Sequence, residues 1–217
     1  ETVQVPRFYL ASLPHDMAAI REAGKRKVLF FKTILPLVLK ANEEVLGHRE
    51  RLWRLHYQAK MSERITAIDQ LWLNDLAEDY GVRLAGRDLP TALTVLLDRV
   101  DVVPTSLALA QAAEESGWGT SRFAKEGNAL FGQWTYKAES GITPKDRDAG
   151  ASHAIKAFDN LGDAVRAYMR NLNTHRAYRK LRTLRADARR RGEAISGYKL
   201  AAGLEKYSAR GEHYISS

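Results

Sequence analysis

The chain has 217 residues, of which 45% are hydrophobic and 28% are charged, a composition typical of a globular protein that buries its own core. It contains no cysteine, which excludes disulfide bonds, thiol catalysis and metal sites built on cysteine. No uninterrupted apolar run reaches the roughly 18 residues of a membrane-spanning helix, and the formal charge of +8 favours polyanions such as nucleic acid, anionic lipid or acidic cell-wall polymer.

Helical periodicity dominates the first half of the chain. Apolar residues recur at three- and four-residue spacing over 26–56, and a shorter helix is expected over 14–23. Ser62 is expected to cap a further helix, which Gly81 closes. A short helix is then expected over 89–97, because Leu89-Pro90 is a suitable start.

Another helix is expected after Pro104, with Gly117 as its left-handed stop. The pattern then changes, and residues 129–158 hold aromatic residues, glycines and the alternating segment HAIKAF, which predict short strands and a loop. Asn160, with Asp163 three residues later, predicts the start of another helix. These elements together predict a predominantly helical α+β chain with a small β excursion.

The segment AEESGWG, residues 113–119, places two adjacent glutamates at the end of a predicted helix. Exposed carbonyls and the negative end of the helix dipole disfavour a second negative charge there. A glutamate kept at this place is expected to hold its proton strongly, as a general acid requires. The two side chains diverge by about 100° around the helix, so at most one faces a cleft, and periodicity does not say which. Two solvated glutamates without a role are the alternative.

Residues 107–134, LALAQAAEESGWGTSRFAKEGNALFGQW, resemble the core signature of bacterial β-N-acetylglucosaminidases of glycoside hydrolase family 73. That signature is roughly A-Q-A-x-x-E-S-G-W-G followed by N-x-F-G. The whole chain resembles the Bax-like branch, from VPRFYLASLP through FDNLGDAVRAYMRNLNTHRAYRKLR to YSARGEHY. The resemblance implies a lysozyme-like fold, with a helical lobe and a small β lobe (about 129–158) beside a substrate groove. It also implies a glucosaminidase catalytic domain over 86–217, after an N-terminal helical extension over 1–85.

Enzymes of this family cleave the β-1,4 bond after N-acetylglucosamine in peptidoglycan. By this resemblance Glu115 is the general acid and Glu114 occupies a variable position. Tyr207 matches an active-site tyrosine of the family's Y-A-T-D-P-x-Y segment, although this chain lacks the Asp-Pro. Two alternatives stay open. A muramidase or lytic transglycosylase also carries Glu-Ser-Gly at a helix end but usually continues into G-L-x-Q, and a non-hydrolytic wall-binding scaffold would need no acid.

The second catalytic group is not defined by the sequence. A retaining glycosidase holds its two carboxylates about 5–5.5 Å apart, an inverting one about 6.5–9.5 Å, and the substrate's own acetamido group is a third possibility. The carboxylate candidates are Glu139, Asp146 and Asp148, all in the β excursion.

Six residues of the signature region are candidates for substrate binding: Gln111, Trp118, Asn128, Phe131, Trp134 and Tyr136. Pyranose faces stack on aromatic rings, which is the reason for the four aromatic candidates. Trp118 is also expected to buttress the turn that follows Glu115. Asn128 is also expected to tie loop backbone together.

The expected partners are peptidoglycan glycan strands in the periplasm or cell envelope. The helices expected over 14–80 exceed what a minimal glucosaminidase needs, so they either dock an envelope protein or cover the catalytic part.

The basic stretch 176–191 is interpreted as a solvated helix face, with peripheral contact to anionic membrane as the functional alternative. Nucleic acid is not expected, because no recognition motif accompanies the charge.

No cofactor is expected, and no metal, since His153 and His175 lack a partnered ligand spacing. The chain starts at Glu1, so we expect processing or truncation, and the missing signal does not argue for the cytoplasm.

Overall fold

The computed structural model describes residues 4–14, 17–135, 141–143 and 154–204. The chain divides into two compact units, each built from two stretches of sequence. Unit 1 comprises residues 1–41 and 105–168, and unit 2 comprises residues 42–104 and 169–217. These boundaries differ from the predicted ranges 1–85 and 86–217. No helix in the described part of the chain is long and apolar enough to cross a membrane.

Helix α1 (Ala23–Lys60) starts in unit 1 and ends in unit 2. In unit 1 its predicted apolar face is confirmed, since Phe30, Ile34 and Val38 are fully buried. The helix expected over 14–23 is wrong. Residues 17–19 form a turn, in which the amide of Met17 donates to the carbonyl of Pro14. A single turn is enough to bury Met17, and so short a helix is marginal in any case.

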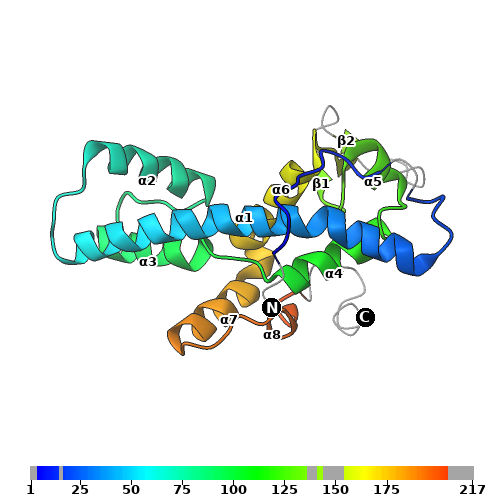
Figure 1. Ribbon diagram of the computed structural model, residues 1–217. Helices are drawn as coiled ribbons and strands as arrows, with labels where there is room; N and C mark the ends of the chain where they lie inside the picture. Colours follow the sequence, from blue (N-terminus) through cyan, green and yellow to red (C-terminus); the bar gives the residue numbers. More distant parts are fainter. Residues whose placement is uncertain (1–3, 15–16, 136–140, 144–153, 205–217) are drawn as a thin grey trace. The chain divides into compact units, whose positions relative to one another are not determined.

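The other elements of unit 1 are α4 (Thr105–Ser116), α5 (Arg122–Gly127), β1 (Trp134–Thr135), β2 (Gly141–Ile142), β3 (Ala154–Lys156) and the first part of α6 (Leu161–Thr174). Figure 1 shows them grouped with the first half of α1. The strands form an antiparallel sheet in the order β1-β3-β2, with Trp134 opposite Ile155 and Gly141 opposite Lys156. The predicted HAIKAF strand and the predominantly helical α+β class are confirmed.

Two helix starts in unit 1 depend on side-chain caps. Asn160 Oδ1 accepts a hydrogen bond from the Asp163 amide at 2.9 Å, as predicted for the start of α6. Helix α5 was not predicted. It has six residues, too few for a periodic apolar pattern, and Ser121 Oγ caps it by accepting from the amide of Ala124 at 3.1 Å.

In unit 2, α2 (Ala67–Asp79) and α3 (Leu89–Arg99) pack with the second half of α1 around a cluster of buried leucines and valines (Figure 1). Gly81, at φ +62°, closes α2 as predicted. The predicted cap at Ser62 is wrong, because Thr66 Oγ1 caps α2 by accepting from the Asp69 amide at 3.1 Å. The Thr66 hydroxyl also donates a hydrogen bond to Asp69 Oδ2. Thr66 and Asp69 thus bond each other in both directions, which favours Thr66 as the cap.

The basic stretch forms η2 (Arg176–Tyr178) and α7 (Arg179–Arg190), followed by α8 (Gly197–Ala201). The expectation of a solvated face is wrong for two of its arginines, since Arg182 and Arg185 are buried. Arg185 donates to the carbonyls of Asp101 and Val102, at 3.1 and 2.7 Å. These carbonyls follow the end of α3, where backbone acceptors lack helical partners. Arg182 and Arg185 therefore satisfy backbone carbonyls inside unit 2.

Candidate active site

Helix α4 ends in a tight turn directly after the two glutamates. The amide of Trp118 donates to the carbonyl of Ala113 at 2.8 Å, and the amide of Gly117 to that of Glu114 at 3.3 Å. This pair of bonds is a Schellman motif. Gly117 has φ +56°, which confirms the predicted left-handed stop, and Trp118 follows with φ +58°. The chain thus turns away one residue after Glu115 and Ser116.

The serine and the second glycine of E-S-G-W-G fix this turn. Ser116 is fully buried, and its hydroxyl donates to the carbonyl of Ala112 at 2.6 Å and accepts from the amide of Gly119 at 2.9 Å. Gly119 has φ +77°, and a Cβ there would lie 2.9 Å from Leu13 Cδ1. Only glycine satisfies both the conformation and the space at this position.

Trp118 packs against the first half of α1. Its ring meets those of Phe30 and Phe31 edge-on, with centroids 5.9 and 5.3 Å apart, and Lys27 Nζ lies 4.6 Å from its centre. Edge-to-face aromatic pairs and a cation above the ring are both favourable. Trp118 therefore buttresses the turn after Glu115, as expected.

The two glutamates differ in environment. Glu114 is exposed and Glu115 is partly buried, as their divergence around α4 requires. Gly132, the glycine of the N-x-F-G part of the signature, lies beside Glu115. A Cβ on Gly132 would be 3.3 Å from Glu115 Oε2, and Gly132 has φ +59°. The fold thus brings the two halves of the signature together at the Glu115 carboxylate.

Phe131, next to Gly132 in the sequence, belongs to a buried group of aromatic and polar side chains. Phe131 stacks on Tyr168 of α6, with centroids 3.9 Å apart and planes inclined by 8°. The Tyr168 hydroxyl donates to Gln111 Oε1 at 2.5 Å, and Gln111 is only 3% exposed. Gln111 precedes Glu115 by one turn of α4. Gln111 and Phe131, both candidates for substrate contact, therefore lie in the packing of unit 1.

Sequence reasoning missed Tyr168. The available signal was the segment RAYMRNL, in which a tyrosine occupies the apolar face of a helix. A buried tyrosine hydroxyl needs a hydrogen-bond partner, and that partner comes from a distant helix that no local pattern names.

Asn128 and Trp134 occupy different environments. Asn128, at φ +51°, ends α5, and its Nδ2 donates to the carbonyl of Phe158 at 3.0 Å, so it ties two loops together as expected. Trp134 lies on β1 and is 63% exposed. It presents a large aromatic surface in the same unit as Glu115.

Five predicted residues lie outside the described part of the chain: Tyr136, Glu139, Asp146, Asp148 and Tyr207. Within the described part, no group of three or more His, Asp or Glu side chains is arranged to hold a metal ion.

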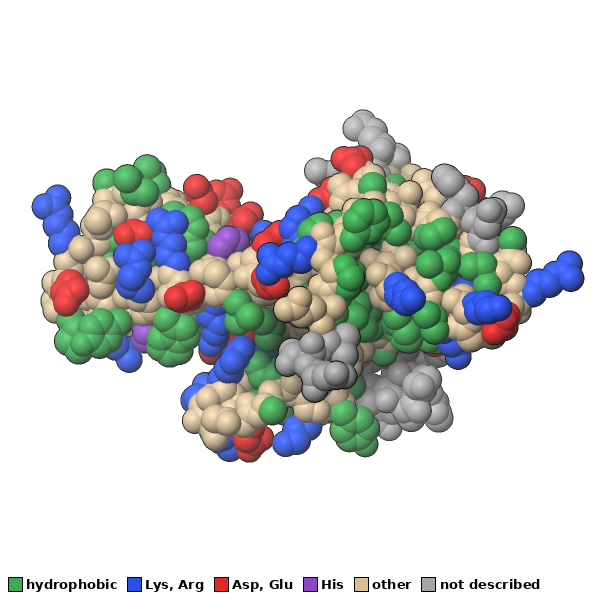
Figure 2. Space-filling model, in the orientation of Figure 1, with side chains coloured by type: hydrophobic (Ala, Val, Ile, Leu, Met, Phe, Trp, Pro, Cys, Tyr) green, Lys and Arg blue, Asp and Glu red, His purple; other side chains and the backbone are tan. Residues whose placement is uncertain are grey.

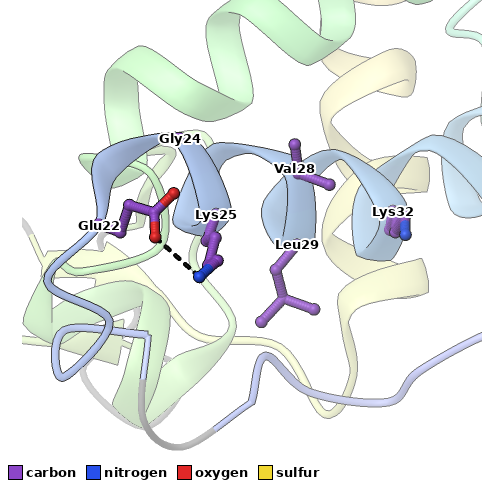
Figure 3. Close-up of a pocket in the computed structure, with 6 residues that line it drawn as sticks. All are labelled: Glu22, Gly24, Lys25, Val28, Leu29 and Lys32. Carbon is purple, nitrogen blue, oxygen red and sulfur yellow. Dashed lines mark ion pairs between the residues drawn. The ribbon is translucent and has the colours of Figure 1, made fainter.

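A hollow of about 340 Å³ lies over the first turns of α1 (Figure 3), lined by Glu22, Gly24, Lys25, Val28, Leu29 and Lys32. Its one ion pair joins Glu22 Oε2 to Lys25 Nζ at 2.8 Å, and both side chains are largely exposed. An exposed ion pair of this kind is weak and screened by water. The Glu115 region remains the candidate active site.

Residues 91–214 match the glucosaminidase family, described as mannosyl-glycoprotein endo-beta-N-acetylglucosaminidase. The chain belongs to this family of glycoside hydrolases, and the predicted enzyme class is confirmed. It is also 32% identical over 204 residues to "Protein bax" of Escherichia coli (strain K12), an alignment that covers 94% of this chain and 71% of that protein. The predicted likeness to the Bax-like branch is therefore confirmed. No solved structure matches the chain.

Proposed function

We propose that this endo-β-N-acetylglucosaminidase cleaves the β-1,4 bond after N-acetylglucosamine in peptidoglycan, with Glu115 as its general acid. The observation that carries the proposal is the approach of Gly132 to the Glu115 carboxylate. The left-handed backbone of Gly132 also favours glycine, and the absence of a side chain there leaves room beside that carboxylate. Glu114 is exposed, whereas Glu115 is partly buried.

The position of Glu115 suits an acid. It lies in the last turn of α4, where the negative end of the helix dipole opposes ionisation, and it is partly buried, which also favours the neutral form. A protonated carboxyl can donate to the leaving glycosidic oxygen as the bond breaks. The rigid turn after Ser116 holds the carboxyl in place, and such positioning is a large part of catalysis.

The second catalytic group is proposed to come from Glu139, Asp146, Asp148 or Tyr207, or from the substrate's acetamido group. Trp134 is proposed to stack on a sugar ring, which its 63% exposure supports. The net charge of +8 supports an acidic polymer as substrate, and the cell envelope is the corresponding location.

Product analysis tests this function. Purified peptidoglycan is digested with the protein, the products are reduced with borohydride, and mass spectrometry identifies the sugar at each new end. Reduced N-acetylglucosamine ends are expected. Reduced N-acetylmuramic acid ends would show a muramidase, and anhydro-muramyl ends a lytic transglycosylase, and either result would refute the proposed bond. Binding without any new ends would favour the scaffold alternative.

A further inference from the structure

Unit 2 contains a cleft of about 230 Å³ between α1, α3 and α7, lined by Arg49, Trp53, His56, Thr94, Leu97, Asp98, Asp101, Ala186, Arg189 and Arg190. None of these residues belongs to the signature at 107–134. On the face drawn in Figure 2, lysines and arginines are scattered among acidic and hydrophobic side chains and form no continuous patch. The cleft lies within unit 2 and gathers several charged side chains, which makes it a more specific place for an anion than single surface charges.

Positive charge is concentrated at the inner end of the cleft. The buried Asp101 carboxylate has three arginines around it: Arg189 at 2.8 Å, Arg49 at 3.5 Å and Arg185 at 3.7 Å. Burial lowers the pKa of Arg185 to about 10, which still leaves it charged at neutral pH. Asp98 adds a second carboxylate and Arg190 a fourth guanidinium group to the cleft. Arginines therefore still outnumber carboxylates in a partly buried region, where an anion is attracted.

Two arginines at the cleft have donors to spare. Arg189 binds Asp101 through Nε and Nη2, and its Nη1 has no hydrogen-bond partner among the described residues. Arg190 donates to Asp187 through Nη2, and its side chain is 65% exposed. The other acid at the cleft is Asp98. Burial raises the pKa of Asp98 despite the nearby Arg190 and Arg49, so it gives up its negative charge at a higher pH than an exposed aspartate.

Trp53 gives the cleft an apolar wall. Its ring meets that of His56 edge-on, with centroids 5.5 Å apart, and Arg49 Cζ lies 6.0 Å from its centre. His56 Nε2 is in turn 3.0 Å from Thr94 Oγ1, which fixes the imidazole. Trp53 is nevertheless 51% exposed. A half-exposed indole held on one edge is a surface that a ligand can cover without reorganising the protein.

We propose that this cleft binds the acidic stem peptides that peptidoglycan carries, with a peptide carboxylate at Arg189 and Arg190 and an adjacent aliphatic group against Trp53. The proposal rests on the proposed function, since it assigns the peptide part of the same substrate. The size of the cleft decides the kind of ligand. Its volume is below that of pockets for drug-sized ligands, which is about 300–1,000 Å³. The cleft therefore suits one or two peptide residues and not a run of sugars. Charge-assisted bonds to arginine give the specificity for a carboxylate.

Isothermal titration calorimetry with the full chain tests this inference. The probe is the free tripeptide alanyl-γ-glutamyl-diaminopimelate, and its fully amidated form, in which every carboxylate is a carboxamide, is the control ligand. The acidic peptide is expected to bind about tenfold or more tightly than the amidated one, because each lost charge-assisted bond costs about that factor. Equal binding of the two peptides, or no binding of the acidic one, would overturn the assignment.

Matched variants locate the binding. Arg190→Gln and Trp53→Leu are each expected to weaken the acidic peptide about tenfold. Arg191→Gln changes an arginine directly after α7, and Tyr57→Leu changes an exposed aromatic residue on α1. Both residues lie outside the cleft, and both variants should bind as the wild type does. Equal weakening in the control pair would refute the site. Vesicles of anionic phospholipid serve as a third probe, and binding to them that Arg190→Gln abolishes would assign the cleft to a membrane surface instead.

The two proposals fail separately. Cleavage of glycan strands stripped of peptide measures the proposed function alone, and the tripeptide titration measures the cleft alone. Cleavage of stripped strands without tripeptide binding would refute the cleft and leave the enzyme assignment intact. Tripeptide binding without any cleavage would refute the reaction and leave an acidic-peptide site.

Discussion

Gly132 and Glu115 meet where the two halves of the signature converge, and a β-carbon at Gly132 would lie 3.3 Å from Glu115 Oε2. Such a contact is tighter than ordinary packing, so a side chain at 132 would push against the carboxylate. Gly132 is also in the left-handed region, at φ +59°, where glycine is at no disadvantage. Both properties favour glycine, but only the contact with Glu115 concerns the reaction.

Replacing Gly132 with alanine should lower activity more than stability. The left-handed backbone costs about 1–2 kcal/mol of folding free energy for a residue with a β-carbon, while displacement of Glu115 is expected to reduce kcat about tenfold. Gly192→Ala is the control, because Gly192 has φ +66° and open space around its α-carbon. Urea unfolding and kcat are measured on both. A similar loss of kcat in both variants would show that strain alone accounts for the effect.

Glu115→Gln should abolish most of the hydrolysis and Glu114→Gln should not. General acid catalysis contributes about 10²–10⁴-fold, so a loss of that size is expected for Glu115→Gln, with little change in thermal midpoint. The control lies one residue earlier and is exposed. Release of reducing ends from peptidoglycan is the measurement. The reverse pattern, with Glu114→Gln inactive, would mean that the carboxylate beside Gly132 is not the acid.

Tyr168→Phe should destabilise the fold. It removes the hydroxyl that donates to Gln111 Oε1 at 2.5 Å, and a buried acceptor without its donor costs about 1–3 kcal/mol. Chemical denaturation of Tyr168→Phe, Gln111→Met and the double variant measures the coupling between the two side chains. Tyr198→Phe, at a residue 90% exposed, should be neutral. Additive single-variant effects would mean that this hydrogen bond contributes nothing to stability.

Asp101 should make unfolding depend on pH in acid. Burial opposes its ionisation, but the hydrogen bond from Arg189 and the charges of Arg185 and Arg49 outweigh burial, so the pKa of Asp101 lies below its ordinary value. A lowered folded pKa stabilises the protein above the unfolded pKa, about 3.9 for aspartate, and this stability is lost as the pH falls through the folded pKa. Unfolding free energy measured from pH 7 down to pH 2 should therefore fall in the most acidic part of the range.

Asp101→Asn isolates that contribution. At pH 7 the variant should lose about 3–5 kcal/mol, because it leaves buried arginines without their carboxylate, and its stability should fall less steeply in acid than that of the wild type. Asp187→Asn removes a largely exposed ion pair with Arg190 and should cost about 1 kcal/mol or less. If the wild type and Asp101→Asn had the same slope in acid, the assignment of the pH dependence to Asp101 would fail.

The sequence alone determined the features that close within a few residues. The left-handed stop at Gly117, the cap at Asn160 and the strand within HAIKAF were all predicted, because each depends on hydrogen bonds or alternation within one short segment. The signature also gave the family. The prediction failed at the start of α2, where Ser62 and Thr66 are both residue types that can cap a helix. Thr66 is the cap, and its hydroxyl also donates to the Asp69 side chain.

Only the tertiary structure decided which side chains meet. The bond from Tyr168 to Gln111 spans 57 residues and that from Arg185 to the carbonyl of Asp101 spans 84. Sequence patterns show that a tyrosine or an arginine lies on a helix, but not which distant carbonyl or amide it will satisfy. Burial makes an unpaired polar group costly, so the folded chain has to form such pairs between distant segments. The approach of Gly132 to Glu115 is likewise made by segments that are separate in the sequence.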